Sequence, residues 1–422
     1  MLRMLRTKNK GNLMKKTKQF YLLFTFLLLF TLSCSLFSSP PIEPVPNLPE
    51  VIPQEELAEE ILPTEEPSAL LPIGVLTEYE GLLTLFDRDG YTLYQANALG
   101  ISSADQNNTH IMSPFSAGTT TLPVLYFSFE QNNSLMLSYN DQITTILSSP
   151  NFSGLAGAPG KAIIAYTTTE FAGESLVSDL YVSGLEFLPV AEPVLHDEDP
   201  QGWAMVALAV EVEDEVPVGV WYSKRPWGIG GDIVFDPRRT LSYLDIRTGR
   251  ISQFLGTDAN PSAISADRKW LAYTNDESAV AGSGSMTIRN VETGVNLSFP
   301  LESMVDPRGA GAASFSPNNQ YLAWMEGNGW QMAETPNFHS VVRAGDLNGN
   351  MVAEFADTAF LSPSGLSVVQ RVEPVGWFDD NTLVVMVRGE HWVNDVAVVK
   401  VDIATKNISF LAKGAFVGLV YP

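Results

Sequence analysis

AISADRKWLAYTN at residues 263–275 and SFSPNNQYLAWME at residues 314–326 are two copies of one pattern, and GWFDDNTLVVMVR at residues 376–388 is a looser third. In each copy an apolar segment ends, a tight turn rich in Asp and Asn follows, and a second apolar segment begins. No long stretch of the chain keeps an apolar period of 3.6 residues. These segments therefore predict short β-strands, and the fold is expected to be all-β.

A second element accompanies these copies. It ends a strand on Asp or Asn and continues into a turn that closes on Gly, or on Lys406-Asn407. Because Gly and Asn accept the left-handed backbone conformation, the element predicts a tight hairpin. Its four occurrences are LSYLDIRTG (241–249), MTIRNVETG (286–294), VVRAGDLNG (341–349) and VVKVDIATK (398–406).

The apolar strand of the repeat recurs along the whole body of the chain. Four-stranded blades of a β-propeller repeat at roughly 40–50 residues. Seven recurrences favour a propeller of seven four-stranded blades over residues 73–422, with six or eight blades as alternatives. The residues that mark the recurrent strand are Leu83, Leu125, Ile164, Val220, Leu271, Leu322 and Leu383.

SFSPNNQYLAWM, AISADRKWLAYT and LSYLDIRTG resemble the WD40-like repeats of TolB-type β-propellers. In that family an SPDGK-type turn precedes a strand, and a D-x-x-T-G turn follows two strands later. The resemblance covers residues 163–411 and implies a β-propeller. It implies little about activity, because propellers host many functions.

The N-terminal region is typical of an exported protein. A basic KKTK segment (15–18) precedes the apolar run 20–32 and the pair Ser33-Cys34. We interpret residues 1–33 as a secretory signal peptide whose end resembles a bacterial lipobox, so that Cys34 becomes the lipidated first residue. An uncleaved membrane anchor is the alternative. Residues 34–72, rich in Pro and Glu and free of bases, predict a disordered, extended tether.

Composition excludes several classes of function. The chain carries 48 acidic and 25 basic residues, a formal net charge of −23, which opposes binding to nucleic acid. A single cysteine excludes an intramolecular disulfide, and the four scattered histidines lack the spacing of most zinc sites. We therefore expect no metal and no cofactor. The acidic run 196–199 offers carboxylates for Ca²⁺, but it lacks EF-hand spacing and is interpreted as a solvated loop.

The repeat also predicts where ligands bind. Equivalent loops emerge on one face of a propeller, and here the loops after the recurrent strand are long. They cover residues 167–178, 223–239, 275–285, 326–340 and 388–395, and three of them carry tryptophan. The alternative is that each tryptophan packs its own loop onto its blade. The predicted binding residues are Arg225, Trp227, Asp232, Trp330, Glu334, His339, His391 and Trp392; no catalytic residue is assigned.

The favoured function is that of a non-catalytic binding or scaffold protein, lipid-anchored in the cell envelope on its extracytoplasmic side. Its expected partners are the membrane, through the N-terminal lipid, and a protein, peptide or glycan of the envelope. The chain is expected to be a monomer. The rival interpretation is an envelope enzyme acting on glycans, as a hydrolase or lyase, which would need acidic groups that converge at the channel mouth.

Overall fold

The computed structural model describes residues 70–97, 111–112, 124–128, 134–139, 142–148, 152–188, 190–228, 234–275, 284–300, 309–328, 338–390 and 395–422. Every described residue belongs to one compact unit, Glu65–Pro422. The predicted signal peptide, Cys34 and nearly all of the predicted tether lie outside these residues. Within them, no helix has the length and apolar character needed to cross a membrane.

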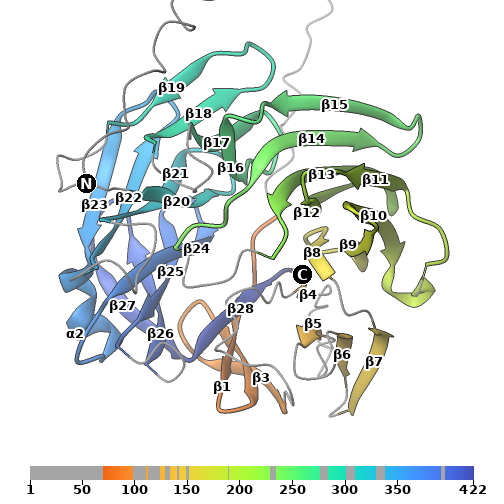
Figure 1. Ribbon diagram of the computed structural model, residues 1–422. Coiled ribbons are helices and arrows are strands. Elements are labelled where there is room, and N and C mark those ends of the chain that lie inside the picture. The colour runs from red at the N-terminus through yellow and green to blue at the C-terminus, as the bar shows by residue number, and fades with distance from the viewer. Residues whose placement is uncertain are drawn as a thin grey trace, which may run out of the picture. The chain divides into compact units, whose positions relative to one another are not determined.

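This unit is a β-propeller of seven four-stranded antiparallel sheets, as the repeat predicted (Figure 1). Blade 1 combines β28 (Ala415–Val420), β1 (Gly74–Tyr79), β2 (Leu82–Asp87) and β3 (Thr92–Asn97). Blade 2 consists of β4 (Ile111–Met112), β5 (Val124–Ser128), β6 (Ser134–Tyr139) and β7 (Gln142–Ser148). Blade 3 consists of β8 (Phe152–Gly157), β9 (Ile163–Ala172), β10 (Ser175–Gly184) and β11 (Leu195–Asp199).

The remaining four blades follow in chain order. Blade 4 has β12 (Trp203–Glu213), β13 (Val216–Pro226), β14 (Arg239–Asp245) and β15 (Arg250–Leu255). Blade 5 has β16 (Ala259–Ile264), β17 (Trp270–Asn275), β18 (Met286–Asn290) and β19 (Asn296–Ser298). Blade 6 has β20 (Gly309–Phe315), β21 (Tyr321–Gly327), β22 (Ser340–Asp346) and β23 (Met351–Ala356). Blade 7 has β24 (Arg371–Asp379), β25 (Thr382–Arg388), β26 (Val396–Asp402) and β27 (Ile408–Lys413). The described helical turns are η1 (Leu185–Phe187), η2 (Asp357–Phe360) and α2 (Leu361–Ser364).

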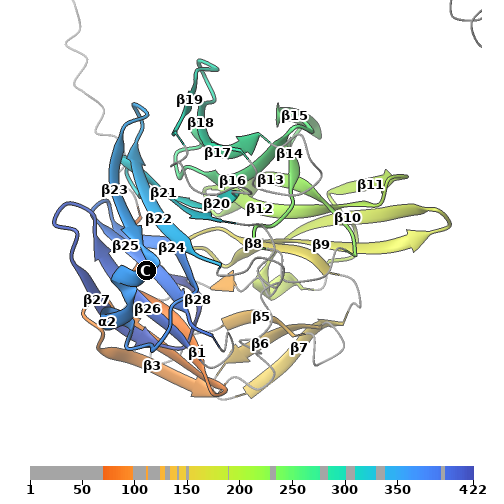
Figure 2. The ribbon, with the colours of Figure 1, turned by 60° about the vertical axis from the view of Figure 1, so that its left-hand side comes forward.

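The first strand of each blade lies nearest the propeller axis (Figures 1 and 2). Contacts join β28 to β4, β4 to β8, β8 to β12, β16 to β20, β20 to β24 and β24 to β28. At the remaining blade boundary β14 contacts β16. The ring is therefore continuous from blade 1 round to blade 7.

The recurrent strand found in the sequence is the second strand of six blades. Leu125, Ile164, Val220, Leu271, Leu322 and Leu383 lie in β5, β9, β13, β17, β21 and β25. Leu83 is the exception, because it lies in β2, the third strand of blade 1. The prediction for blade 1 was wrong by one strand, since the C-terminal β28 supplies the strand nearest the axis there.

The predicted Asp/Asn turns close the third strand of their blades. Asp402 Oδ1 accepts the Thr405 N–H at 2.7 Å, and Asp346 Oδ1 accepts the Asn348 N–H at 2.9 Å. Each of the four turns ends on a residue in the left-handed region, as predicted. These residues are Gly249 (φ 70°), Gly294 (φ 71°), Gly349 (φ 84°) and Lys406 (φ 59°).

The hydrophobic core lies largely between adjacent blades. Trp377 of β24 stacks on Tyr321 of β21, with 6.4 Å between the ring centroids. Its Nε1–H donates to the Ser314 carbonyl of β20 at 3.1 Å. Trp324 of β21 packs at 4.6 Å on Phe299, which follows β19. Aromatic side chains thus pack blade 6 against both of its neighbours.

One predicted loop is absent. Residues 167–178 form the ends of the long strands β9 and β10, which Gly173-Glu174 join in a two-residue turn. The β9–β10 ladder runs without a register shift from Gly184↔Ile163 to Ser175↔Ala172, so the segment is a hairpin and not a binding loop.

Candidate functional site

The candidate site lies on the loop face, the face on which the second strand of each blade leads to the third. The strands nearest the axis also begin there. Of the predicted binding residues, Arg225, Trp227 and His339 belong to the described chain. Asp232, Trp330, Glu334, His391 and Trp392 lie outside it.

Residues 234–238, which we call the strap, extend from blade 4 to blade 6. Val234 and Phe235 are each 3% exposed and form one apolar cluster with Met325 and Phe338 of blade 6. Gly311 of β20 makes room for this contact, because a Cβ there would lie 2.5 Å from Phe235 Cδ1. The strap therefore fills a place that blade 6 leaves open for it.

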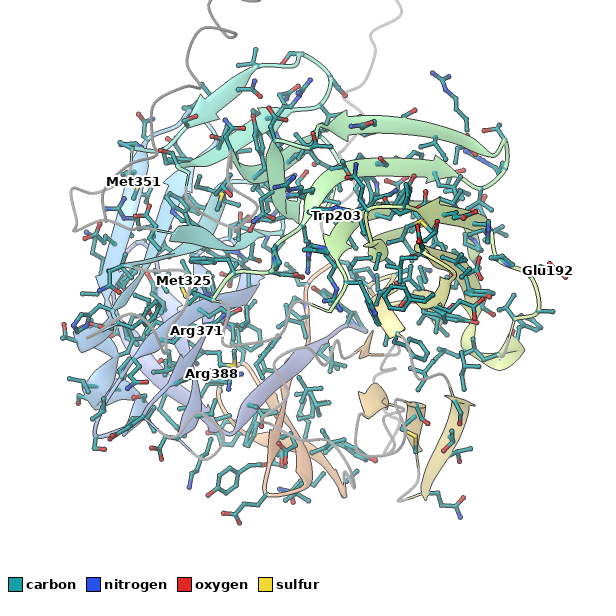
Figure 3. The ribbon with its side chains drawn as sticks, viewed as in Figure 1. Glu192, Trp203, Met325, Met351, Arg371 and Arg388 are labelled. Atoms are coloured by element: carbon teal, nitrogen blue, oxygen red, sulfur yellow. The ribbon has the colours of Figure 1, made fainter. Side chains whose placement is uncertain are left out.

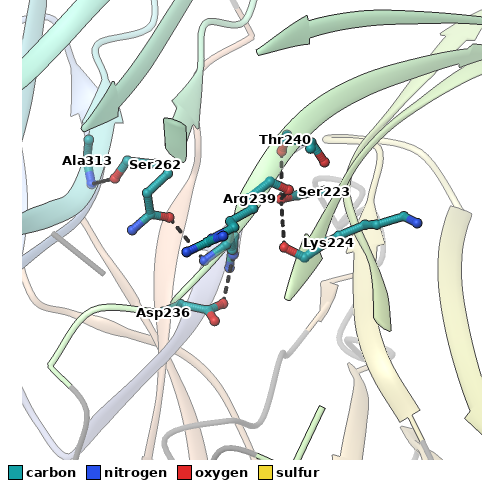
Figure 4. Close-up of polar contacts among 9 residues, drawn as sticks. Ser223, Lys224, Asp236, Arg239, Thr240, Ser262 and Ala313 are labelled. Atoms are coloured by element: carbon teal, nitrogen blue, oxygen red, sulfur yellow. Dashed lines mark hydrogen bonds and ion pairs between the residues drawn. The ribbon is translucent and has the colours of Figure 1, made fainter. Parts of the chain in front are cut away.

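Two polar contacts fix the strap on the neighbouring blades. The Arg238 N–H donates to Asn260 Oδ1 of β16 at 3.1 Å, which holds the strap to blade 5 (Figure 4). Arg371 of β24 donates from Nη2 to the Val234 carbonyl at 3.1 Å, which holds it to blade 7. Blade 5 is itself joined to blade 6, since Ser262 Oγ accepts the Ala313 N–H at 2.9 Å. The strap thus starts from blade 4 and contacts blades 5, 6 and 7.

Three charged side chains lie at the strap: Arg238 and Asp236, which form an ion pair, and Arg225. Arg238 donates from Nε to Asp236 Oδ2 at 2.7 Å, and their side chains are 27% and 35% exposed. Burial opposes ionisation of Asp236, but the charges of Arg238 and Arg225 outweigh it and lower the pKa of this carboxyl. Burial also lowers the pKa of Arg225; Asp236 attracts its charge and Arg238 repels it. Within the described chain, the Arg225 guanidinium donates no hydrogen bond and joins no ion pair.

Strand alternation separates Arg225 from its neighbour Lys224. Successive side chains of β13 point to opposite faces of the sheet. Lys224 lies 2.8 Å from Asp197 and 3.0 Å from Asp199, both on β11 of blade 3. Figure 4 shows its side chain running away from Asp236. The acidic run 196–199 is therefore part of an edge strand, and its interpretation as a loop was wrong. Lys224 pairs with two of its three carboxylates, and Glu198 stays exposed.

A second pair of arginines lies in blade 7. Arg371 and Arg388 stand directly opposite each other on β24 and β25, and Figure 3 shows them side by side. They are 7% and 6% exposed, and Glu373 lies 2.8 Å from Arg371. Burial lowers the pKa of Arg388 to about 10; Glu373 opposes this shift and Arg371 adds to it. Like charges that face each other across a ladder are destabilising, so this pair has a cost in stability.

Two tryptophans flank blade 4 at the loop face. Trp203 begins β12, and the Arg239 guanidinium carbon lies 4.9 Å from its ring centroid, a cation–π contact. Trp227 is half-buried, and its backbone N–H donates to the Gly202 carbonyl at 2.9 Å. Trp227 thus has a partly exposed side chain, and a hydrogen bond holds its backbone.

His339 is oriented by a carboxylate. Its Nδ1 lies 2.7 Å from Asp357 Oδ2; His339 is 59% exposed and Asp357 is 8% exposed. Asn328 Oδ1 accepts the His339 N–H at 2.9 Å. These contacts lie over the outer strands of blade 6, where β22 begins and β23 ends.

The sequence-based reasoning missed Asp236, Arg238, Trp203, Arg371 and Arg388. The scarcity of basic residues was a signal that could have found the arginines. In an acidic chain, basic residues that gather at strand ends on one face create an unusual local positive charge. In the described chain, no three side chains of His, Cys, Asp or Glu come together as a metal site. What the described loop face offers chemically is a set of guanidinium donors beside aromatic rings.

No protein-family model matches the sequence, and no curated protein matches it significantly. Solved structures with similar folds include an oligogalacturonate lyase from Vibrio parahaemolyticus, with 11% identity over 82% of this chain and 85% of that one, and a TM-score of 0.44. A putative TolB from Agrobacterium tumefaciens has 11% identity over 63% and 85% of the two chains, with a TM-score of 0.39. Prolyl oligopeptidase B from Galerina marginata has 8% identity over 83% and 52%, with a TM-score of 0.46. At these identities the similarity goes no further than the fold.

Proposed function

We propose that this protein is a binding or scaffold protein that holds a protein, peptide or glycan on the loop face of its propeller. The observation that carries the proposal is the fixed strap. Its apolar residues pack on blade 6, Asn260 accepts its Arg238 N–H, and Arg371 donates to its Val234 carbonyl. A loop already held in one conformation loses little entropy when a ligand binds, which favours recognition.

The composition of the loop face supports the same proposal. Trp and Arg are the side chains that most often anchor binding partners. Here Trp203, Arg225 and Trp227, at the loop-face end of blade 4, are each only partly buried. Loops on a rigid scaffold are the usual place for binding residues, and the interlocked blades supply that scaffold.

The proposed location follows from the N-terminal sequence. A basic segment, the apolar run 20–32 and Ser33-Cys34 support export and lipidation at Cys34. The lipid would hold the protein on the extracytoplasmic side of a membrane, and the acidic, proline-rich residues 34–72 would set the propeller away from the bilayer. We propose that it acts there as a monomer.

The test is capture of a partner from an envelope extract of the source organism with the mature chain. Truncating a binding anchor costs roughly 2–4 kcal/mol of binding, or about 30- to 1,000-fold in affinity. We expect Trp227→Ala to weaken capture by this amount and to keep a near-wild-type melting temperature. Phe187→Ala is the matched control, because Phe187 is an aromatic side chain, 70% exposed, at the opposite end of blade 3.

The same measurement separates binding from packing. A Trp227 that only packs its loop would lower the free energy of unfolding by roughly 3–5 kcal/mol on truncation and leave capture by the folded fraction intact. Trp330→Ala and Trp392→Ala extend the test to two further loops. Normal capture by all three variants, or early melting of all three, would refute the proposal.

One observation favours the rival function, a hydrolase or lyase acting on glycans. With Nδ1 of His339 engaged by Asp357, Nε2 is the ring nitrogen left for proton transfer, as a general base requires. The test is incubation of the mature chain with neutral and acidic oligosaccharides. Release of fragments by the wild type and its loss in His339→Gln would favour an enzyme over a binding protein.

A further inference from the structure

We infer that Arg225 and Arg238, at the loop-face end of β13 and in the strap, form an oxyanion site that binds a carboxylate group of the ligand. The inference rests on the proposed binding function and names the chemistry that the loop face recognises. It assigns Arg225 as the direct contact and Arg238 as the supporting charge.

The first argument is that Arg225 has no partner among the described residues. A guanidinium offers five N–H donors and stays charged under ordinary conditions. Half-buried at the end of β13, Arg225 forms no hydrogen bond or ion pair with any described residue. Burying a charge without a partner is costly, and a bound anion removes that cost.

The second argument is the local charge. Lys224 faces Arg239 across the β13–β14 ladder, so the residues one step further out, Arg225 and Arg238, lie next to each other at the loop-face end of blade 4. Arg238 holds Asp236 at 2.7 Å, so that carboxylate is already engaged. The three arginines Arg225, Arg238 and Arg239 outnumber the single carboxylate of Asp236, so the group has a net positive charge. A carboxylate reduces that charge, and its two oxygens match two parallel N–H donors of one guanidinium. In a chain of net charge −23 this local excess is not a general property of the surface.

The third argument is access. The side chains of Arg238 and Asp236 are 27% and 35% exposed, so the group opens to solvent. The residue opposite Arg225 on β12 is Ala204, whose methyl group offers no acceptor to the guanidinium. Trp203 precedes Ala204 and lies under Arg239, which brings an aromatic ring to the same strand end. A carboxylate can therefore reach Arg225 from the loop face and accept two parallel N–H bonds.

The strap holds this geometry in place. Asp236 is two residues from Val234, whose carbonyl is fixed by Arg371, so the two α-carbons are at most about 7 Å apart. On its other side Arg238 is held by Asn260 of blade 5. The supporting charge therefore cannot drift from Arg225 unless contacts with two other blades break.

The experiment measures binding of fluorescently labelled hexaglutamate to the mature chain by anisotropy. Hexaglutamine is the neutral probe, and Arg225→Gln is the test variant. Arg250→Gln is the matched control, because Arg250 is an exposed arginine at the opposite end of blade 4 and its loss changes the net charge equally. We expect hexaglutamate to bind, hexaglutamine not to bind, Arg225→Gln to weaken binding at least tenfold, and Arg250→Gln to change it less than twofold.

Three results would overturn the inference. Hexaglutamate fails to bind, or both arginine variants weaken binding equally, which would indicate general electrostatics. Alternatively, inorganic phosphate displaces the labelled peptide more strongly than acetate at the same concentration, which would refute the carboxylate assignment. Partner capture that depends on Trp227 but survives Arg225→Gln would refute the oxyanion site and leave the proposed binding function standing.

Discussion

Arg371 and Val234, 137 residues apart in the chain, are joined by a hydrogen bond of 3.1 Å from the guanidinium Nη2 to the backbone carbonyl. The bond links the first residue of β24 in blade 7 to a loop that starts in blade 4. It places a charged donor on a neutral acceptor inside the protein, where such bonds are strongest. The conformation of the blade 4 loop therefore depends on a residue of another blade.

Replacing Arg371 tests this dependence. Arg371→Gln removes the donor to Val234 and the ion pair with Glu373, and it also relieves the repulsion between Arg371 and Arg388. We therefore expect the free energy of unfolding to fall, but by less than the roughly 1.5–3 kcal/mol that a hydrogen bond to a charged group contributes. Amide hydrogen exchange should quicken at residues 234–238 and stay unchanged in β14. Arg250→Gln serves as the charge-matched control. Unaltered exchange in the strap would show that Phe235 alone holds it.

Enlarging Gly311 tests the apolar end of the strap. A methyl group there would meet Phe235 Cδ1 at 2.5 Å, so Gly311→Ala should destabilise the protein by roughly 1–3 kcal/mol, as overpacking does. Adding Phe235→Ala should return part of that loss, because the two changes share one space. Denaturant melts of both single variants and the double variant measure the coupling. Strictly additive losses would mean that the two residues do not meet.

Acid should weaken the hairpin turns. The Thr405 N–H and hydroxyl lower the pKa of Asp402 below its usual value. A carboxyl with a lowered folded pKa contributes stability that is present above the unfolded pKa, about 3.9, and lost as pH falls through the folded pKa. We expect Asp402→Asn to have a lower melting temperature than the wild type at pH 7. As the pH falls below about 4, the melting temperature of the wild type should drop more than that of the variant. Parallel pH profiles would contradict this expectation.

Lipidation at Cys34 can be tested directly. Growth with a labelled fatty acid should tag the wild-type protein, because the chain has a single cysteine, next to Ser33 and after an apolar run. Cys34→Ala should abolish the tag and release the protein from membranes. Labelling that persists in the variant would refute a lipid at this position, and membrane retention without label would favour the uncleaved anchor.

The fold could be predicted because its repeat consists of turns and strands that short stretches of sequence determine. Turn residues such as Gly349 and Asp402, and strands such as that of Leu322, combine short-range chemistry with a regular spacing. Blade 1 misled the prediction, because β1 and β2 are both apolar and β1 pairs with a strand from the far end of the chain. No local pattern near Leu83 shows that its blade needs β28.

The candidate site was less predictable because it depends on contacts between blades. Arg225 and Trp227 could be named from their loop, but Arg371 lies in another blade and shows no link to them in sequence. Residues 167–178 were predicted to be a binding loop, because Gly173-Glu174 and the polar residues around it are also common in loops. The structure shows a hairpin there. Tertiary contacts decide both cases.

The pairing of β28 with β1 also sets when the propeller can be finished. Ribosomes make the chain from the N-terminus, so blade 1 exists for most of synthesis as three strands, with an edge of β1 unpaired. Residues 415–420 are made after the other strands of the propeller, and they alone fill that edge. The unpaired edge of β1 can therefore pair with other chains until β28 has been made, and a chain that stops before residue 415 would leave the ring open.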